Sequence, residues 1–416
     1  MQMVILAAAS LFVQAQQKED IVELEHADSL VGTEINGEKA REYIGHVRLK
    51  HGNTLMTCDR AIQYLSSNKI SMEGVVEVHD DTMRLVTMRG MYFGDTKMIE
   101  GYERILIEEP NTVLRAAFGR YFLDEKKAFF RGNVYVEDTA SVLTSNELTH
   151  FREQQYSVAD GNVKIVNRRN ALTIYGNHFE SFKKLKYSKV TDHPKVVQID
   201  TSSNGKKDTL IVIAKLMESY QDTMERLIAT DSVEITRSGL SAQAGLCTYY
   251  TDLDSIILLK SPYVWYQSEK NDDNQVSGES IYIKLLKRRL QTAYVRGHAV
   301  AISRADSIRT DRFNQMTGQE IILHFDKDKI QRLDVDVTAT SLYYLFDKGK
   351  ANGMNKTTGD HVTMTFVDGK IDKITAISNV EGEYYPEKQI NGKEADYNLP
   401  EFNWREDRPG KRNVKK

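Results

Sequence analysis

The sequence predicts an all-β fold in which a short unit is repeated many times along the chain. The first observation is a motif of glycine followed by alternating apolar residues, which begins at Gly45, Gly74, Gly101, Gly132 and Gly161, with spacings of 29, 27, 31 and 29 residues. The second is the two-residue alternation itself, which is typical of strands with one apolar face. The third is the composition, with 6 prolines against 25 glycines and 21 tyrosines, which favours strands separated by turns. A period of about 30 residues indicates a repeat architecture.

Residues 1–15 are predicted to be a secretory signal peptide. An apolar run extends from Val4 to Val13, and Val13 and Ala15 occupy the −3 and −1 positions of a cleavage site before Gln16. No Lys or Arg precedes this run. The alternative interpretation is a buried N-terminal strand or helix.

The first predicted module, residues 25–200, contains the clearest copies of the repeat. In the copy around Gly132, apolar residues share one parity with the glycine, while Arg131, Asn133 and Glu137 take the other. A glycine in the middle of a strand marks a bend, a bulge or a close backbone approach. Repeating that bend would crease the sheet along a line, with apolar side chains inside. Alternatively, each glycine ends one strand and begins the next.

The second predicted module, residues 201–385, contains weaker copies, which begin at Asp231, Pro262 and Gly297, after one at Pro194. An aromatic residue follows most copies of both modules at a nearly fixed distance of 18 to 20 residues. The exception is Tyr220, 26 residues after its motif, where residues 202–208 form an insertion typical of a loop. The eight aromatic residues are Tyr64, Tyr92, Tyr121, Phe151, Phe179, Tyr220, Tyr249 and Tyr282.

The remaining residues, 386–416, are polar and without period, so we expect a largely disordered tail in which only "LPEFNW" (399–404) docks locally. The two cysteines, Cys58 and Cys247, are separated by 189 residues (247 − 58). They are free to pair in an oxidising compartment, but two buried free thiols are the favoured interpretation.

Motifs for catalysis, cofactor binding and metal binding do not occur in the sequence. None of the ten histidines belongs to an HExxH or Cys/His pattern, and the formal net charge of −3 gives no nucleic-acid footprint. Two basic stretches, Lys183–Lys189 and Lys284–Arg289, either meet phosphorylated lipid or form solvated faces. A rival hypothesis, a β-helical polysaccharide lyase or hydrolase, requires an acidic constellation on one face, and none is evident.

The motif "GNVYVED" at Gly132, followed by a strand with small residues and an aromatic, and its partial copy "TLMTCDRAIQYL" at Thr54 resemble the OstA-like family. That family includes the lipopolysaccharide-transport protein LptA and the N-terminal domain of LptD. The resemblance covers about residues 25–385 and returns in "MNKTTGDHVTMTFVDGKIDKITAISNVEGEYYPE". It implies a repetitive, V-shaped, semi-closed β-jelly roll, as one extended array or two consecutive modules.

The same resemblance implies a non-enzymatic periplasmic protein without cofactors or metals, which carries lipopolysaccharide toward the outer membrane with the lipid A acyl chains in its apolar groove. Expected partners, bound by edge-strand addition, are an LptC-like inner-membrane protein and an LptD-like outer-membrane protein. Head-to-tail self-association is also expected. The chain is about twice as long as an ordinary LptA, which leaves the number of modules open.

The residues predicted to line this groove occupy the apolar parity of the repeats. The alternative is a fully packed solenoid core without room for lipid. The predicted lining residues are Val47, Leu49, Val76, Val78, Phe130, Val134, Val136, Val163, Ile165, Val233 and Ile235.

Overall fold

The computed structural model describes residues 22–168, 171–201, 207–267, 273–286, 289–306, 309–326, 329–347, 349–367 and 370–410. The predicted signal peptide lies outside these residues. The fold is all-β: 28 strands belong to one hydrogen-bonded sheet, and every strand pair described is antiparallel. The chain divides into two compact units, and β12 contributes to both.

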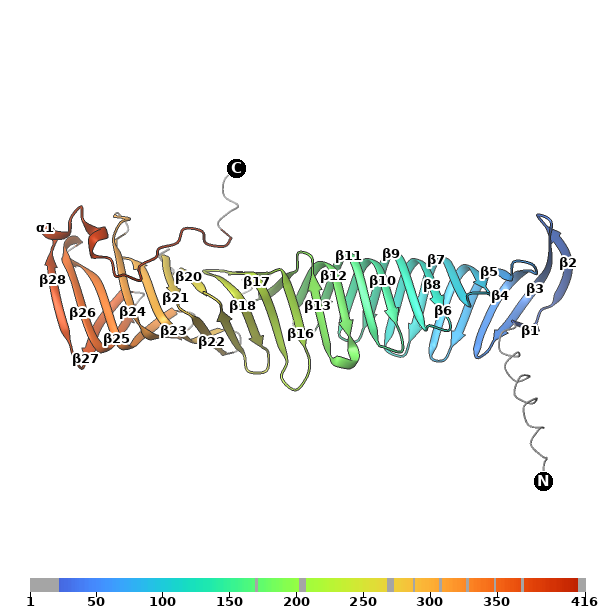
Figure 1. Cartoon of the computed structure of the whole chain (residues 1–416), viewed down its shortest axis with the longest axis horizontal. Coiled ribbons are helices and arrows are strands. Elements are labelled where there is room, and N and C mark those ends of the chain that lie inside the picture. Colours follow the sequence, from blue (N-terminus) through green and yellow to red (C-terminus); the bar gives the residue numbers. More distant parts are fainter. Residues whose placement is uncertain are drawn as a thin grey trace, which may run out of the picture. The chain divides into compact units, whose positions relative to one another are not determined.

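Unit 1 comprises residues up to 170 and residues 176–184, drawn from blue to green in Figure 1. Most of its strands form a meander in which each pairs with the next along the chain. The strands are β1 (Glu23–His26), β2 (Ser29–Ile35), β3 (Glu38–His51), β4 (Thr54–Tyr64), β5 (Lys69–Asp80), β6 (Met83–Phe93), β7 (Met98–Glu109), β8 (Thr112–Phe122), β9 (Lys127–Asp138), β10 (Ser141–Phe151), β11 (Tyr156–Asn167) and β12 (Leu172–Phe182).

A bend crosses the strands of unit 1 near their middle. The register between β5 and β6 shifts between Glu73 and Val76, and Gly74 lies there with φ of 96°. At the bend of β3, Gly45 and His46 both have positive φ, 76° and 45°. Such consecutive left-handed residues open the ladder locally and turn the strand. From β3 to β11 the strand continues beyond each bend, so the creased sheet is the interpretation that holds there, whereas the corner between β1 and β2 separates two strands.

The bends also correct the register of one predicted repeat. The left-handed residues of β7 are Glu103 and Arg104, not Gly101. Bends therefore begin at residues 45, 74, 103, 132 and 161, a constant step of 29 (74 − 45 = 29, and likewise for the others). Gly101 instead faces the core beside Ile105, where an added Cβ would lie 2.5 Å from a side-chain carbon.

The bend divides unit 1 into two arms that share one hydrophobic core. Arm 1 denotes the strand halves that carry Ile70 and Tyr121, and arm 2 the halves that carry Val47 and Val78. Buried residues of both arms belong to a single cluster. The fold is therefore a jelly roll whose arms meet face to face, as the sequence predicted.

Unit 2 comprises residues 171–175 and 185–416 and repeats this plan with more interruptions. β17 and β18 run through their bends, but several corners break a strand into two short ones, as between β13 and β14. Both interpretations of the repeat therefore occur in the chain. The strands are β13 (Tyr187–Thr191), β14 (Lys195–Thr201), β15 (Lys207–Ile213), β16 (Leu216–Tyr220), β17 (Arg226–Arg237), β18 (Leu240–Tyr250), β19 (Ser255–Leu259), β20 (Tyr263–Gln267), β21 (Asp273–Ser277), β22 (Ser280–Leu286), β23 (Arg289–Arg304), β24 (Phe313–Asp326), β25 (Lys329–Asp347), β26 (Lys350–Val367), β27 (Lys370–Ile377) and β28 (Glu381–Pro386).

Helical structure is scarce in the described ranges. It comprises the 3-10 helix η1 (Lys183–Leu185), the single-turn helix α1 (Glu387–Ile390) and the 3-10 helix η2 (Glu394–Tyr397). Among the residues that the structure describes, no helix combines the length and apolar character needed to cross a membrane.

Candidate functional site

All eleven predicted lining residues face the interior of their unit. Nine lie in unit 1, where seven are buried and Val136 and Ile165 are partly buried against the same cluster. Val233 and Ile235 are buried in the corresponding cluster of unit 2. The structure therefore brings the residues together by unit, and their role in lining a lipid groove stays a prediction.

The sequence analysis missed most of arm 1. Of the eleven residues only Phe130 belongs to it, although Ile70, Met72 and Ile99 are equally buried on the facing side of the core. The signal was available, because the apolar alternation continues on both sides of each bend. The prediction favoured the residues that follow the glycine and gave less weight to those before it.

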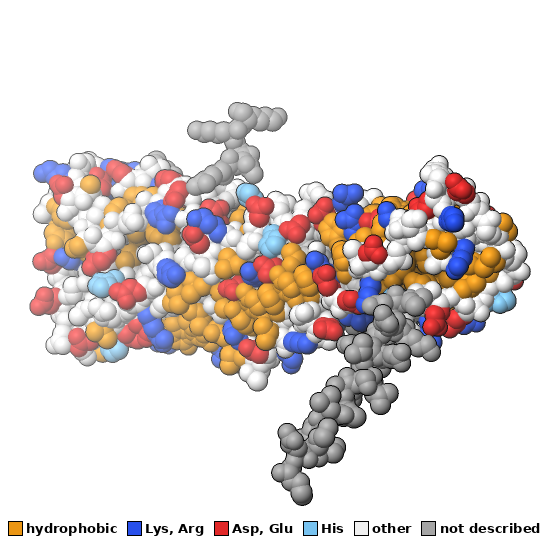
Figure 2. Space-filling model, turned by 45° about the vertical axis from the view of Figure 1, so that its right-hand side comes forward, with side chains coloured by type: hydrophobic (Ala, Val, Ile, Leu, Met, Phe, Trp, Pro, Cys, Tyr) orange, Lys and Arg blue, Asp and Glu red, His pale blue; other side chains and the backbone are white. Residues whose placement is uncertain are grey.

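The interior of unit 2 is more exposed than that of unit 1. In unit 1, six partly buried apolar residues pack against the core, whereas fourteen do so in unit 2, counted over the described residues. Three of them, Leu285, Phe325 and Phe366, lie near the ends of β22, β24 and β26. We call this edge of unit 2 the apolar rim. Figure 2 shows a broad area of hydrophobic side chains on one face, bordered by charged ones.

Across the interior of unit 2, the rim makes an aromatic contact. The rings of Tyr266 and Phe325 lie 6.1 Å apart at an interplanar angle of 72°, an edge-to-face arrangement. β20 and β24 are not hydrogen-bonded neighbours, since β20 pairs with β18 and β21. The contact therefore joins the two sides of unit 2 through apolar surfaces.

In unit 1 the ends of the two arms, beside the shared hydrophobic core, meet instead through polar groups. The turns of arm 1 approach the strand ends of arm 2 along one line, which we call the seam. These turns comprise residues 94–97, 123–126 and 152–155. The Tyr121 hydroxyl donates a hydrogen bond of 2.7 Å to Asp80, and Lys126 Nζ lies 2.8 Å from the same carboxylate. Tyr92 Oη lies 3.2 Å from His51 Nδ1, one repeat earlier.

Arg152 adds a second cation to the seam. Its Nη2 donates to Thr82 Oγ1 at 3.1 Å, and its guanidinium lies 3.7 Å from Asp80 and 3.5 Å from Glu109. Asp80 is only 2% exposed. Burial by itself would raise the pKa of its carboxyl, but the hydrogen bonds from Lys126 and Tyr121 and the nearby cations outweigh burial and lower that pKa.

The outer faces of the strands carry paired charges. Arg84, for example, bridges Glu77 at 2.6 Å and Glu108 at 2.7 Å across three neighbouring strands. Most histidines also lie beside a carboxylate, as His298 does at 3.0 Å from Glu279. Within the described part of the chain, no group of His, Cys, Asp and Glu could hold a metal ion. These charges hydrate the outside and keep the apolar surface inside.

Each unit buries one free thiol in its core. Cys58 lies in the cluster of unit 1 and Cys247 in that of unit 2, and neither forms a disulfide. Burial raises the pKa of each thiol to about 12. The interpretation as two buried free thiols is confirmed.

The C-terminal segment from Glu387 to Pro409 lies along the outer face of unit 2, and we call it the strap. Its composition had predicted a largely disordered tail. Tyr263 donates a hydrogen bond of 2.5 Å to the Asn403 carbonyl, and the Arg405 guanidinium lies over the rings of Tyr263 and Trp265 at 4.7 and 5.1 Å. Local composition missed this because the strap's partners lie far away in sequence.

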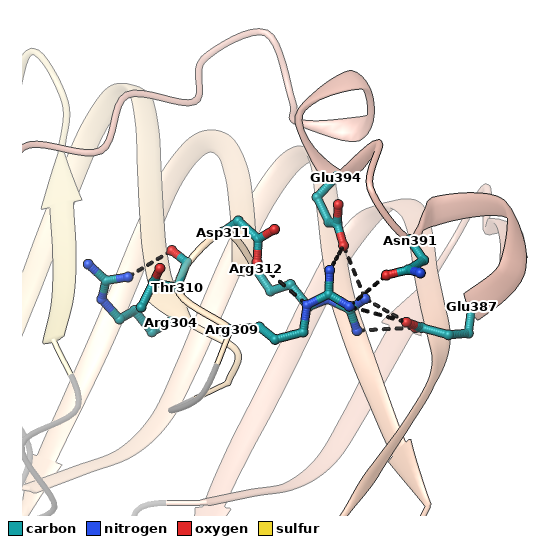
Figure 3. A network of polar contacts seen from close by, with 8 residues as sticks. All are labelled: Arg304, Arg309, Thr310, Asp311, Arg312, Glu387, Asn391 and Glu394. Carbon is teal, nitrogen blue, oxygen red and sulfur yellow. Dashed lines mark hydrogen bonds and ion pairs between the residues drawn. The ribbon is translucent and has the colours of Figure 1, made fainter.

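The beginning of the strap is fixed by buried charge (Figure 3). Arg312 is 0% exposed and pairs with Glu387 at 2.6 Å and with Glu394 at 3.1 Å. Arg309 reaches Glu394 at 2.7 Å from the same loop. Ile390 and Leu399 complete the attachment by packing with Leu342, Tyr344 and Met354.

Two family models match the chain. The model of OstA-like protein matches residues 19–177. The model of LptA/(LptD N-terminal domain) LPS transport protein matches residues 116–289. No curated protein gives a significant match. The two family matches overlap in unit 1, and the second continues into unit 2 through β22.

Proposed function

Because the chain belongs to the OstA-like family of lipopolysaccharide-transport proteins, we propose that it is a periplasmic bridge that carries lipopolysaccharide toward the outer membrane. In this proposal the lipid A acyl chains lie between the arms of each unit, and the saccharide remains outside. The observation that carries the proposal is the apolar rim of unit 2, which leaves interior side chains such as Phe325 and Phe366 partly exposed.

The energetics favour a shielded path for the cargo. Exposing one CH₂ group to water costs ~0.8 kcal/mol, so a chain of 14 carbons unshielded in water costs on the order of 10 kcal/mol. Contact with the interior residues of either unit would remove most of that cost. A series of similar apolar contacts also suits transport, because no single position holds the lipid tightly enough to stop its movement.

A photo-crosslinking series tests this proposal. p-Benzoylphenylalanine at Ile235, which faces the interior, should crosslink to lipopolysaccharide, whereas the same residue at Glu234, the next position along β17, should not. Leu285 gives a second interior site at the apolar rim. Equal crosslinking at Ile235 and Glu234, or none at any interior position, would contradict lipid carriage and support a packed core.

Partner binding is proposed at the two ends of the sheet. β1 and β2 pair only with β3 among the strand pairs described, and β27 and β28 only with β26. Unpaired strand edges accept further strands. We propose that these edges bind an LptC-like protein, an LptD-like protein or a second copy of the chain.

The rival hypothesis of a polysaccharide lyase or hydrolase has a direct test. Incubation of the purified protein with acidic glycans should give no cleavage products. Turnover would contradict a purely lipid-carrying role.

A further inference from the structure

The seam of unit 1 and the rim of unit 2 differ in chemistry although both lie where strand ends meet across an interior. In unit 2 the contact across the interior is aromatic. In unit 1 it is an ion-pair cluster around one buried carboxylate, Asp80. Packing alone does not require charged groups at such a place, since Tyr266 and Phe325 join the two sides of unit 2 by an apolar contact.

The cluster is built from parts that lie far apart in the sequence. Asp80 ends β5 in arm 2, Tyr121 lies near the end of β8 in arm 1, and Lys126 and Arg152 belong to turns of arm 1. No backbone ladder joins these elements across the seam: β5 pairs with β4 and β6, and β8 with β7 and β9. Side chains alone therefore hold the seam at this point.

From this geometry we infer that Asp80, Tyr121, Lys126 and Arg152 form a latch that closes the interior of unit 1 and opens to admit the acyl chains of the cargo. The inference rests on the proposed function, which supplies the cargo. Separating the ion pairs of the seam lets their groups regain water, so this part of the cost is partly offset by hydration. The apolar core behind the seam becomes exposed as well, and the entering acyl chains would cover it.

The two native thiols provide the measurement. Cys58 lies inside the latched unit and Cys247 inside the other, and both have similarly raised pKa values. In chains that keep only one of the two cysteines, a thiol reagent such as 5,5′-dithiobis(2-nitrobenzoate) should therefore report the opening of each unit separately. Asp80→Asn removes the central charge with almost no change in shape, and it should make Cys58 react about tenfold faster or more, the effect of about 1.4 kcal/mol on an opening equilibrium. The rate at Cys247 should not change.

The matched control is Glu77→Gln, on the same strand as Asp80. It removes an ion pair of 2.6 Å with Arg84 on the outer face, away from the seam, and should leave the Cys58 rate unchanged. If Asp80→Asn fails to fold, Lys126→Met gives the same test, since its side chain is 28% exposed and Tyr121 and Arg152 remain. Unchanged Cys58 reactivity, or equal acceleration at both thiols, would overturn the latch.

A second readout separates the latch from the proposed function. Photo-crosslinking of lipopolysaccharide from p-benzoylphenylalanine at Val134, inside unit 1, should also become faster in Asp80→Asn. Faster thiol labelling without any crosslinking would retain the opening seam but contradict lipid admission. Crosslinking in the wild type with no effect of Asp80→Asn on either readout would retain the lipid carrier and refute the latch.

Discussion

The attachment of the strap gives a prediction whose size follows from burial. Replacing both Glu387 and Glu394 by Gln leaves the guanidinium of Arg312 at 0% exposure without a counter-charge, and its Nε already has no hydrogen-bond partner. An uncompensated buried charge costs about 3–5 kcal/mol. We expect the double variant to lose about that much stability in unit 2 and to release the strap.

Arg312→Met is the matched comparison. It removes the buried charge, and Arg309 still pairs with Glu394 at 2.7 Å. Replacing a buried ion with an apolar side chain of similar volume is often close to neutral. We therefore expect this variant to lose much less stability than the double glutamine variant, which removes the ion pairs of Arg309 as well as those of Arg312 and leaves the buried charge of Arg312 uncompensated.

Tryptophan fluorescence during urea unfolding measures both effects. The protein has two tryptophans: Trp265 lies beneath Arg405 of the strap, and Trp404 lies in the strap itself, with its ring 4.8 Å from that of Phe313. Trypsin cleavage at Arg405 provides an independent measure of release. Equal stability of the double variant and the wild type, or equal losses in the two variants, would refute the reasoning.

Three further predictions concern other parts of the chain. Because the pKa of Asp80 is lowered on folding, the ionised carboxylate contributes to stability above the ordinary pKa of about 3.9, and this contribution is lost as the pH falls below that value through the folded pKa. Urea unfolding of wild type and Asp80→Asn at pH 7 and pH 3 should therefore show a smaller effect of pH on the stability of the variant. Gly74→Ala should destabilise unit 1 by about 1–2 kcal/mol in thermal unfolding, because φ is 96° and the new Cβ would lie 2.1 Å from Asp59, whereas Gly32→Ala, with open space around it, should not; equal effects would count against strain at the bend. Val31→Pro in the exposed edge strand β2 should weaken binding to a strand-adding partner in a pull-down while leaving the circular dichroism spectrum unchanged, and undiminished binding would place the partner elsewhere.

The period and the strand type could be predicted from sequence, because each repeat shows the apolar alternation of a strand and most repeats begin with the same motif. The exact register could not be predicted at Glu103 and Arg104, because the motif is marked by glycines, whereas here the backbone has non-glycine residues in the left-handed region. The same happened at Pro194, which follows the left-handed pair Asp192 and His193. Glycine eases such a bend, but the neighbouring strands are sufficient to impose it.

The seam was beyond sequence reasoning for a different reason. Two adjacent aspartates such as Asp80 and Asp81 are typical of a solvated turn. Only the approach of the two arms in the folded structure makes their surroundings different. In the structure Asp80 is 2% exposed, while the side chain of Asp81 is 64% exposed. Neighbouring identical residues thus acquire different roles through contacts 41 and 46 residues away, with Tyr121 and Lys126.

The position of the bends bears on how the proposed cargo would fit between the arms. The ladder hydrogen bonds lie on either side of each bend and skip the bend itself, as between Glu73 and Val76. A change in the angle between the arms would therefore require backbone torsions at only a few residues per strand and would leave the ladders intact. Under the proposed function, such hinges would let each repeat adjust its width to the number of acyl tails that it holds, without refolding.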